Sequence, residues 1–294
     1  MKTIRSDVIG YCFGVSKTIQ DAQACLEKAK AKGVACYSIG SLIHNKFVVD
    51  SFVKQGMTTI EEASDVQPGI ALVRAHGIPE SQKRDFLEKG FEVVDSTCPI
   101  VAKGSEALRS AAKKGKALII IGFRGHAEVV GLQGVEVQEG KRIEAHLISS
   151  LEEAKAFVAS GLVGIDQAIT VVTQTTFGQE DFNAIRDCLK SHFTNITFPT
   201  QPCGATSQRI KAVKKLASIV DAVVVVGGKN SANTKGLANV AQNQGKRAFL
   251  IESVADIDEN MRGELAKYNC VGLCSGSSTP SAMIDPIEEL LESL

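Results

Sequence analysis

Three cysteines lie where the sequence changes from a strand pattern to a helix pattern. They are Cys12, Cys98 and Cys203, one in each third of the 294-residue chain. A thiolate just before a helix is favoured by the helix dipole and by the unpaired N–H groups of the first turn, which lower the thiol pKa. Three thiolates without an obvious fourth leave one iron of a four-iron cluster open, as a Lewis-acid catalyst requires. Spacing alone leaves a second interpretation open, in which each cysteine is a small buried apolar residue.

The other cysteines lie inside helix or strand patterns, and we expect them to be structural. No Cys-x-x-Cys sequence occurs, which disfavours zinc. In a reducing cytosol a disulfide framework is not expected either, so metal binding or catalysis is the better interpretation of a high cysteine count. The cysteines assigned to the core are Cys25, Cys36, Cys188, Cys270 and Cys274.

Three histidines stand beside glycine or asparagine at the ends of predicted strands. They are His44, His76 and His126. Histidines in such loops can donate hydrogen bonds to an anionic ligand or transfer protons. The alternative, that each is an ordinary loop histidine with its hydrogen bonds satisfied, remains open. His146 and His192 have no such context, and we expect them to be structural.

Two loops rich in glycine, serine and asparagine follow predicted strands near the end of the chain. They cover residues 226–234 and 275–280. Backbone amides, hydroxyls and a helix N-terminus in such a loop can hold phosphate. Neither loop is a P-loop or a dinucleotide fingerprint, and many loops of this composition merely turn the chain. The threonines at 173, 175 and 176 end another strand, where threonine is common for packing reasons alone.

The elements that must position these residues alternate between strand and helix. Short, apolar, β-branched runs are typical of strands buried on both faces, and amphipathic stretches separate them. This alternation predicts an α/β fold with parallel sheets and right-handed crossovers. Strands are expected at 34–39, 70–74, 91–95, 117–122, 168–173, 221–228, 247–251 and 270–275. Helices are expected at 16–31, 103–114, 180–192 and 207–218.

The spacing of the three cysteines predicts three similar α/β units. We expect them at 1–97 with Cys12, at 98–196 with Cys98 at its start, and at 197–294 with Cys203 and a C-terminal helix. Ligands of open parallel sheets bind at the carboxyl ends of the strands. Three units around a common axis would therefore direct the three cysteines toward one central cavity.

Composition excludes several classes of protein. Lysine plus arginine equals aspartate plus glutamate, 33 each, whereas a nucleic-acid binder normally carries a basic surface. No signal or transit segment is visible, and the longest apolar runs are far too short for a membrane span. We therefore expect a cytoplasmic protein with no nucleic-acid or membrane partner.

Taken together, these motifs are similar to those of the 4-hydroxy-3-methylbut-2-enyl diphosphate reductases, which catalyse the last step of the methylerythritol phosphate route to isoprenoids. The resemblance runs essentially from end to end. The matching motifs lie, in order, at 11–15, 44–50, 75–77, 95–99, 125–129, 173–176, 203–206, 228–233 and 275–280.

The resemblance implies an iron–sulfur oxidoreductase. It would reductively dehydroxylate (E)-4-hydroxy-3-methylbut-2-enyl diphosphate to isopentenyl and dimethylallyl diphosphates, using a 4Fe-4S cluster with one open iron. The implied cluster ligands are Cys12, Cys98 and Cys203. The implied diphosphate ligands are His44, His76, Ser231, Asn233 and Ser278, with His126 lining the same cavity. The family fold is a cloverleaf of three α/β units. Because no flavin or nicotinamide fingerprint is present, the electron donor is expected to be a ferredoxin or flavodoxin.

The resemblance also implies that Glu128 and Thr175 deliver a proton, with His126 close by. Glu128 is the only carboxylate of its motif and stands two residues after His126. Within a regular helix that spacing would not place both side chains on one face, so we expect an irregular loop or the start of a helix. Desolvation would raise the pKa of the Glu128 carboxyl toward neutrality. The alternative is that Glu128 only caps a helix.

Some positions depart from the family pattern. Ala127 replaces a usual proline, Ala232 a serine that helps to hold diphosphate, and Ser281 a usual aspartate; Gly204 and Ile210 also differ. They leave open a member with a shifted substrate preference. Two rival functions are a non-redox dehydratase on the same scaffold and a cluster-based sensor without catalysis.

Overall fold

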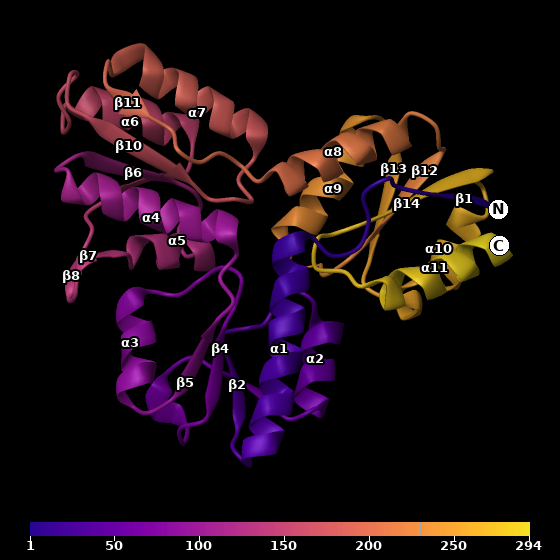
Figure 1. Ribbon diagram of the computed structural model, residues 1–294. Helices are drawn as coiled ribbons and strands as arrows, with labels where there is room; N and C mark the ends of the chain where they lie inside the picture. Colours follow the sequence, from indigo (N-terminus) through magenta and orange to yellow (C-terminus); the bar gives the residue numbers. More distant parts are fainter. Residues whose placement is uncertain (230) are drawn as a thin grey trace. The chain divides into compact units, whose positions relative to one another are not determined.

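The computed structural model describes residues 1–229 and 231–294. Asn230, which belongs to one motif of the resemblance, and the side chain of Ala232, one of the departures, lie outside the described residues. Strands and helices alternate along the chain (Figure 1). Over the described ranges they form three sheets of four parallel strands and one small hairpin. The expected α/β class is confirmed.

The first sheet lies within residues 36–95 and has the spatial order β3-β2-β4-β5. Each residue of β2 and β4 is buried, as expected for parallel strands covered on both faces. The strands are β2 (Cys36–Ile39), β3 (Met57–Ile60), β4 (Ile70–Val73) and β5 (Glu92–Asp95). The neighbouring helices along the chain are α1 (Phe13–Lys32), α2 (Lys46–Lys54), the 3-10 turn η1 (Ala63–Asp65) and α3 (Glu80–Glu88).

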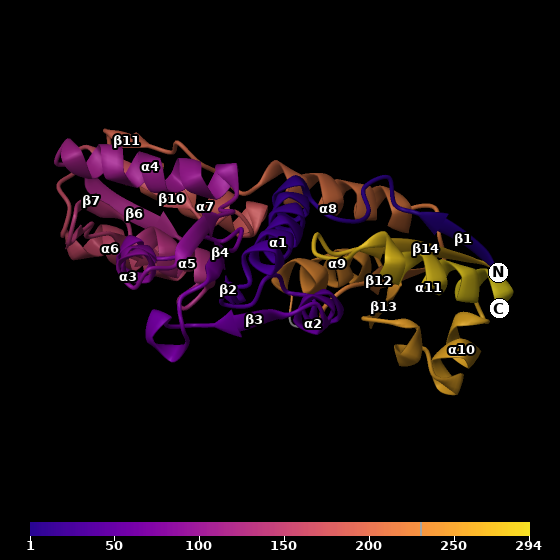
Figure 2. The same ribbon diagram turned by 60° about the horizontal axis from the view of Figure 1, so that its bottom comes forward.

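The second sheet lies within residues 117–197 and has the order β11-β10-β6-β9. Side chains of β6 alternate between two apolar clusters, Ile119 packing with α6 and α7 and Ile120 with α4 and α5. Helices α4 and α6 thus lie on opposite sides of β6 and β10 (Figure 2). The strands are β6 (Ala117–Ile121), β9 (His146–Ile148), β10 (Ile169–Thr173) and β11 (Ile196–Thr197). The helices are α4 (Pro99–Lys113), α5 (Ala127–Gln133), α6 (Leu151–Ser160) and α7 (Gln179–His192), and the hairpin is β7 (Glu136–Gln138) with β8 (Lys141–Arg142).

The third sheet combines the N-terminal strand with residues 222–275, in the order β1-β14-β12-β13. Valines of β12 alternate between two clusters, Val224 packing toward α11 and Val225 toward α8 and α9. The strands are β1 (Lys2–Arg5), β12 (Ala222–Val226), β13 (Arg247–Ile251) and β14 (Cys270–Ser275). The helices are α8 (Gly204–Ala217), α9 (Ala232–Asn243), the 3-10 turn η2 (Val254–Asp256), α10 (Glu259–Leu265) and α11 (Ser281–Ser293).

All three sheets share one strand order. Counted along the chain, each places its second strand at one edge, followed by the first, the third and the fourth. In the third sheet the fourth place is taken by β1, which pairs in parallel with β14. The central pair, the first and third strands, marks the point where the chain order reverses. Ligands bind beside the carboxyl ends of the strands at such a point.

The chain divides into two compact units. The first contains Met1–Ser16, Ile43–Ser51 and Gly204–Leu294, and the second contains Lys17–Leu42 and Phe52–Cys203. The third sheet belongs to the first unit, and the other two sheets belong to the second. The expected boundaries near residues 97 and 196 remain predictions. Among the described helices, none has both the length and the apolar character needed to cross a membrane.

Candidate active site

Cys12, Cys98 and Cys203 each come directly before a helix, namely α1, α4 and α8. Each also follows the strand that fills the fourth place of a sheet, because β1 plays that part for Cys12. Cys98 is the N-cap of α4, with Pro99 in its first turn. The predicted position at a strand-to-helix turn is therefore found three times in the same topological place.

Backbone hydrogen bonds fix the three cysteines locally. The Cys98 N–H donates to the Ala75 carbonyl at 3.0 Å, and the Cys203 N–H donates to the Thr175 carbonyl at 2.7 Å. The Cys12 N–H donates to the Ser277 carbonyl at 3.1 Å. Each of these acceptors lies in a loop that follows a central strand. The cysteine motifs are thus held against the polar loops rather than packed into a core.

Burial separates the eight cysteines into two groups. Over the described residues none of them forms a disulfide; Cys12, Cys98, Cys188, Cys203 and Cys270 are half-buried, and Cys25, Cys36 and Cys274 are buried. Burial raises the pKa of the Cys25 thiol to about 12, of Cys36 to about 11 and of Cys274 to about 12, so these remain protonated core residues. Three accessible cysteines at helix N-termini are a donor set that fits an iron–sulfur cluster, because cluster iron is bound by thiolates.

His126 lies at the start of the helix α5, which is one of the two arrangements, an irregular loop or a helix start, that the spacing to Glu128 predicted. It is the N-cap, and its Nδ1 accepts the Glu128 backbone N–H at 3.2 Å. Gly125 precedes it with a φ of +75°, a conformation that disfavours side chains. Because Nδ1 is an acceptor, the uncharged form of His126 carries its proton on Nε2.

Glu128 is a buried carboxyl group, and both of its oxygens accept hydrogen bonds from Thr175. The residue is only 1% exposed. Thr175 donates its backbone N–H to Oε1 at 2.7 Å and its hydroxyl to Oε2 at 2.7 Å. Burial raises the pKa of Glu128 to about 7, although both Thr175 hydrogen bonds act in the lowering direction. A carboxyl group with this pKa exchanges its proton near neutral pH, as a general acid requires.

Gln174, the neighbour of Thr175 along the chain, is a buried polar residue that sequence reasoning did not single out. The Gln174 side chain is fully buried, accepts the Phe123 N–H at 2.9 Å and donates to the Thr176 hydroxyl at 2.6 Å. A Cβ on Gly122 would lie 2.6 Å from the Val129 side chain and 3.0 Å from the Gln174 side chain, so this close approach needs glycine. The signal available in the sequence was a glutamine among the threonines that end a predicted strand.

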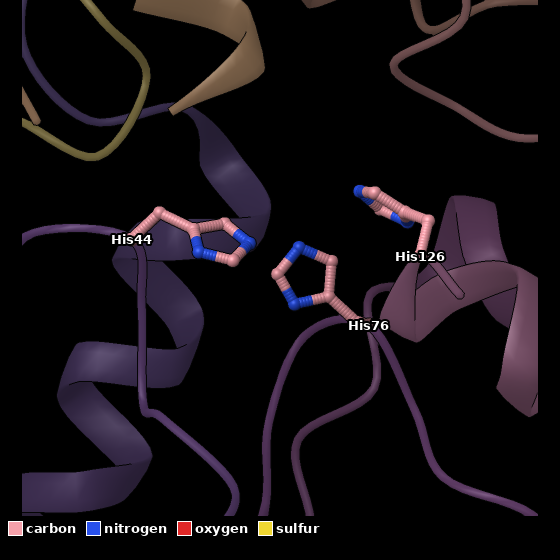
Figure 3. Close-up of side chains that lie close together, drawn as sticks. All are labelled: His44, His76 and His126. Carbon is pink, nitrogen blue, oxygen red and sulfur yellow. The ribbon is translucent and has the colours of Figure 1, made fainter. Parts of the chain in front are cut away.

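His76 and His126 lie next to each other in the second unit. Their ring centroids are 5.7 Å apart and their planes are nearly perpendicular, at 83° (Figure 3). His76 follows β4, and the turn is closed by a Gly77 N–H to Arg74 carbonyl hydrogen bond of 3.0 Å. The two predicted histidines therefore converge from the reversal points of two different sheets.

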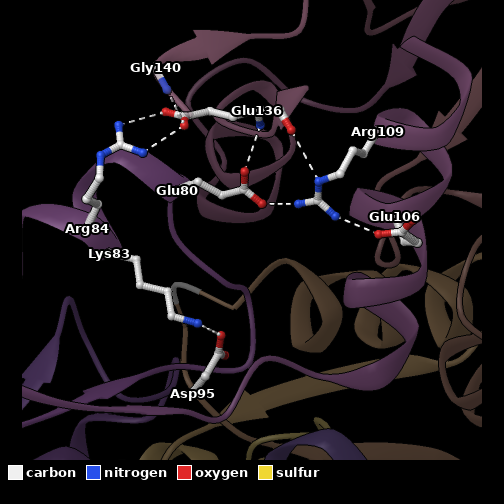
Figure 4. A network of polar contacts seen from close by, with 8 residues as sticks. All are labelled: Glu80, Lys83, Arg84, Asp95, Glu106, Arg109, Glu136 and Gly140. Atoms are coloured by element: carbon white, nitrogen blue, oxygen red, sulfur yellow. Dashed lines mark hydrogen bonds and ion pairs between the residues drawn. The ribbon is translucent and has the colours of Figure 1, made fainter. Parts of the chain in front are cut away.

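A network of ion pairs and hydrogen bonds connects the elements that follow these histidines in the chain (Figure 4). Glu80, at the start of α3, accepts the Glu136 N–H at 2.9 Å and pairs with Arg109 of α4. Glu136 is buried, and Arg84 donates to it twice, at 2.8 and 3.1 Å. The Glu80 N–H also donates to the carbonyl of Gly134, the C-cap of α5, at 3.2 Å. The network joins α3, α4 and the end of α5.

The first unit gathers the other predicted polar residues. Ser231 caps α9 by accepting the Thr234 N–H, and Asn233 donates to the Ser277 hydroxyl at 3.0 Å. Ser277 was missed by sequence reasoning, which chose its half-buried neighbour Ser278. The loops after β12 and β14, which are the central strands of the third sheet, are thus joined directly.

His44 belongs to the first unit as well. It is exposed and lies in the loop before α2. A Cβ on Gly228 would lie 2.6 Å from the His44 carbonyl oxygen, so this loop packs closely against the loop after β12. Asn45 next to it accepts the Val48 N–H and contacts Met283 of α11.

The predicted site residues therefore fall into two groups. The first unit holds Cys12, His44, Ser231, Asn233 and Ser278. The second unit holds Cys98, Cys203, His76, His126, Glu128 and Thr175.

Comparison with known proteins gives one consistent result. The model of the family described as "LytB protein" matches residues 4–292. A protein of Treponema denticola named 4-hydroxy-3-methylbut-2-enyl diphosphate reductase is 33% identical over 292 residues, which is 98% of each chain. A protein of the same name from Solidesulfovibrio magneticus is 33% identical over 300 residues and covers both chains fully.

Two solved structures are similar along nearly the whole chain. The E-1-hydroxy-2-methyl-but-2-enyl-4-diphosphate reductase from Plasmodium falciparum superposes with a TM-score of 0.85 and 28% identity, covering 98% of this chain and 87% of that one. A structure of (E)-4-hydroxy-3-methyl-but-2-enyl diphosphate reductase, the terminal enzyme of the non-mevalonate pathway, gives a TM-score of 0.74 with 26% identity and complete coverage of both.

Proposed function

Because the chain belongs to the LytB protein family, we propose that it reduces (E)-4-hydroxy-3-methylbut-2-enyl diphosphate to isopentenyl and dimethylallyl diphosphates. The reaction consumes two electrons and two protons and releases one water, since the allylic carbon–oxygen bond is replaced by a carbon–hydrogen bond. Relatives at 33% identity carry the name of this reductase over the full length of the chain.

The observation that carries the proposal is the buried pair of Glu128 and Thr175. A hydroxyl group leaves with difficulty unless it is protonated as the bond breaks. The pKa of Glu128, raised to about 7 by burial, lets it hold that proton at neutral pH. The Thr175 hydroxyl orients the carboxyl group, and the Thr175 carbonyl receives the Cys203 N–H. The acid is thereby tied directly to a cysteine motif.

The proposed cofactor is a 4Fe-4S cluster held by Cys12, Cys98 and Cys203. When bound, a cluster with one iron not ligated by cysteine supplies electrons one at a time and a Lewis-acidic site for an oxygen ligand. The chain's part is to provide three thiolates at helix N-termini, where the helix dipole stabilises their charge.

The proposed diphosphate ligands are hydroxyl and amide donors together with histidines. They are His44, His76, His126, Ser231, Asn233 and Ser278. The Nε2–H of neutral His126 is one such donor, because its Nδ1 is engaged with the Glu128 N–H. Hydroxyl, amide and imidazole groups can all donate hydrogen bonds to a diphosphate, so the proposed site does not require a P-loop lysine.

The proposed setting is the cytoplasm, where thiols stay reduced. The proposed electron donor is a reduced ferredoxin or flavodoxin, which delivers single electrons. The test therefore uses a chemical one-electron donor in place of either protein.

The experiment is an anaerobic assay of the reconstituted protein with the diphosphate substrate and reduced methyl viologen. We expect both isopentenyl and dimethylallyl diphosphate, with two viologen radicals consumed for each product. A Cys188→Ser variant should behave like the wild type, since Cys188 lies within α7. Turnover without viologen oxidation would favour the dehydratase, and a reconstituted protein without any turnover would contradict the proposal.

A further inference from the structure

Arg209 is a buried arginine that joins the loop before Cys12 to the end of β14. It lies in α8 and is only 2% exposed. Its Nη2 donates to the Gly10 carbonyl at 2.6 Å, and its Nη1 donates to the Ser275 carbonyl at 3.1 Å. One guanidinium group therefore bridges two chain segments that are far apart in sequence.

The bridged segments are also joined to each other. The Gly10 N–H donates to the Ser275 hydroxyl at 2.9 Å, and the Cys12 N–H donates to the Ser277 carbonyl at 3.1 Å. Together with the two hydrogen bonds of Arg209, these two contacts form a closed frame of four hydrogen bonds around the backbone that leads to Cys12. A planar guanidinium with fixed donors suits such a frame better than a flexible ammonium group.

The charge of Arg209 lacks a carboxylate partner. Over residues 1–229 and 231–294, Arg209 takes part in no ion pair, and its buried Nε has no hydrogen-bond acceptor. A guanidinium group stays protonated in proteins, so its burial without a counter-charge is costly. A structure that retains such a cation is expected to place an anion beside it.

Cys12 is the group that fits this requirement. Burial lowers the pKa of Arg209, and the sulfurs of Cys12 and then Cys274 act on it in the raising direction. Cys274 is an unsuitable anion, because complete burial raises its thiol pKa to about 12. A thiolate at Cys12, held as a cluster ligand, would supply the missing negative charge.

We propose that Arg209 is the positioning residue of Cys12: it fixes the ligand's backbone and its positive charge stabilises the thiolate-bound cluster in the reduced state. The inference rests on the proposed function, since it takes Cys12 to be a cluster ligand. A nearby buried cation favours the more negative, reduced form of a cluster, because uptake of an electron is stabilised by the opposite charge.

Two variants separate the roles of charge and frame. Arg209→Gln removes the charge, whereas Arg209→Lys keeps it but cannot hold both carbonyls in a fixed fork. In Arg209→Gln we expect the equilibrium constant for one-electron reduction to fall at least about tenfold, a shift of about 59 mV to more negative potential. In Arg209→Lys the potential should stay near wild type, while iron is lost faster to a chelator.

The measurements are an anaerobic redox titration followed by electron paramagnetic resonance, and iron and sulfide content over time with chelator. Lys211→Gln is the matched control, because Lys211 lies on the same helix, is exposed and also loses one positive charge. It should leave potential and iron loss unchanged. Circular dichroism of the cluster-free variants verifies that each is folded.

The outcomes also separate this inference from the proposed function. If wild type binds a cluster, Cys12→Ser loses it, and Arg209→Gln has wild-type potential and iron retention, the role of Arg209 is refuted and the function stands. If Arg209→Gln and Lys211→Gln shift the potential equally, a specific role is likewise refuted. If wild type binds no cluster, or Cys12→Ser keeps full iron, the proposed function itself fails.

Discussion

At the scale of single residues, the proposed role of Glu128 as a proton donor can be tested most directly. It is buried, it has both carboxylate oxygens held by one residue, and its pKa is raised to about 7. All three properties follow from the packing of the start of α5 against the end of β10, where Thr175 contacts Glu128. A carboxyl group so placed acts in catalysis and also makes the stability of the fold depend on pH.

The Glu128→Gln variant keeps the shape and hydrogen bonding of the side chain but has no acidic proton. We expect it to bind cluster and substrate normally and to lose at least about 10²-fold in turnover, the lower end of a general acid's contribution. Single-turnover kinetics with the reduced enzyme measures this directly. Turnover within a few-fold of wild type would move the acid's role to the substrate phosphate or to water.

The same variant tests the raised pKa through stability. A carboxyl group with a folded pKa of about 7 and an ordinary value of 4.5 binds its proton more tightly in the folded state. Its favourable contribution is complete below pH 4.5 and is lost as the pH rises through about 7. Up to about 3 kcal/mol of unfolding free energy should be lost over that range. Urea unfolding of cluster-free protein at several pH values should show a smaller loss in Glu128→Gln than in wild type; parallel curves would contradict the assignment.

Thr175 can be tested separately from Glu128. In Thr175→Val the hydroxyl that lowers the Glu128 pKa is gone, so this pKa should rise further. Because turnover needs protonated Glu128, the pH at which turnover falls should move up by about one unit. Maximal turnover should decrease as well, since the carboxyl group loses its orienting contact. Thr175→Ser keeps the hydroxyl and is expected to retain the wild-type profile.

At the scale of secondary-structure elements, the site depends on loops after central strands and on cysteines after fourth strands. The fourfold valine run of β12 and the two central strands of the second sheet, β6 and β10, were predictable, because buried parallel strands are continuous apolar runs. The short strands β9 and β11 of that sheet were not predicted. The short strand β1, with its partly exposed pattern, was not predicted. Its pairing with β14 depends on a partner about 270 residues away, which no local pattern reveals.

Residues whose role depends on such distant contacts were missed for the same reason. Ser277, Gln174 and Arg209 are polar residues whose partners come from other loops. By contrast, a helix start at His126 was one of the two arrangements predicted, because a two-residue spacing is a local property. Sequence therefore proposes the reactive groups, and the structure was needed to identify the residues that hold them.

The packing of α5 against α3 provides an element-scale prediction. A Cβ on Gly134 would lie 2.5 Å from the side chain of Pro79, and Gly134 has an ordinary φ of −86°. Gly134→Ala should therefore act through steric overlap alone, costing about 1–3 kcal/mol of stability. It should also weaken substrate binding, because the loop of His76 would shift relative to α5. Gly164→Ala is the control, since its Cβ would meet only Gln167, at 4.0 Å. Equal stability of the two variants, measured by urea unfolding, would contradict this packing argument.

The loops after β12 and β14 give a second prediction at this scale. Ser278→Ala and Asn233→Ala should each weaken substrate binding by about 1–3 kcal/mol, the usual loss when a charged acceptor loses a donor. Asn233→Ala should have the larger effect, because it also breaks the contact with Ser277 that joins the two loops. Binding is measured by calorimetry on the oxidised protein, with the visible spectrum as a control for an intact cluster. Unchanged affinity in both variants would remove these loops from the diphosphate site.

At the scale of the whole molecule, three sheets with one strand order place their chemistry at equivalent positions. The central strands of each sheet end in the polar loops, and the fourth strand leads into a cysteine and a helix. In the third sheet the fourth strand is β1, which comes from the N-terminal part of the chain and pairs with β14. Cys12 belongs to the first unit, and Cys98 and Cys203 belong to the second.

The proposed cluster predicts the effect of removing iron. A ligand that binds only the native state raises stability by mass action. We expect anaerobically loaded protein to unfold at a higher temperature than chelator-treated protein. Cys12→Ser should lose the cluster and unfold like chelated wild type, because serine oxygen is a poor substitute for thiolate on iron. Cys188→Ser should follow the loaded wild type. The measurement is differential scanning calorimetry in sealed cells: if loaded and chelated wild type unfold at the same temperature, the three cysteines do not hold a shared cluster.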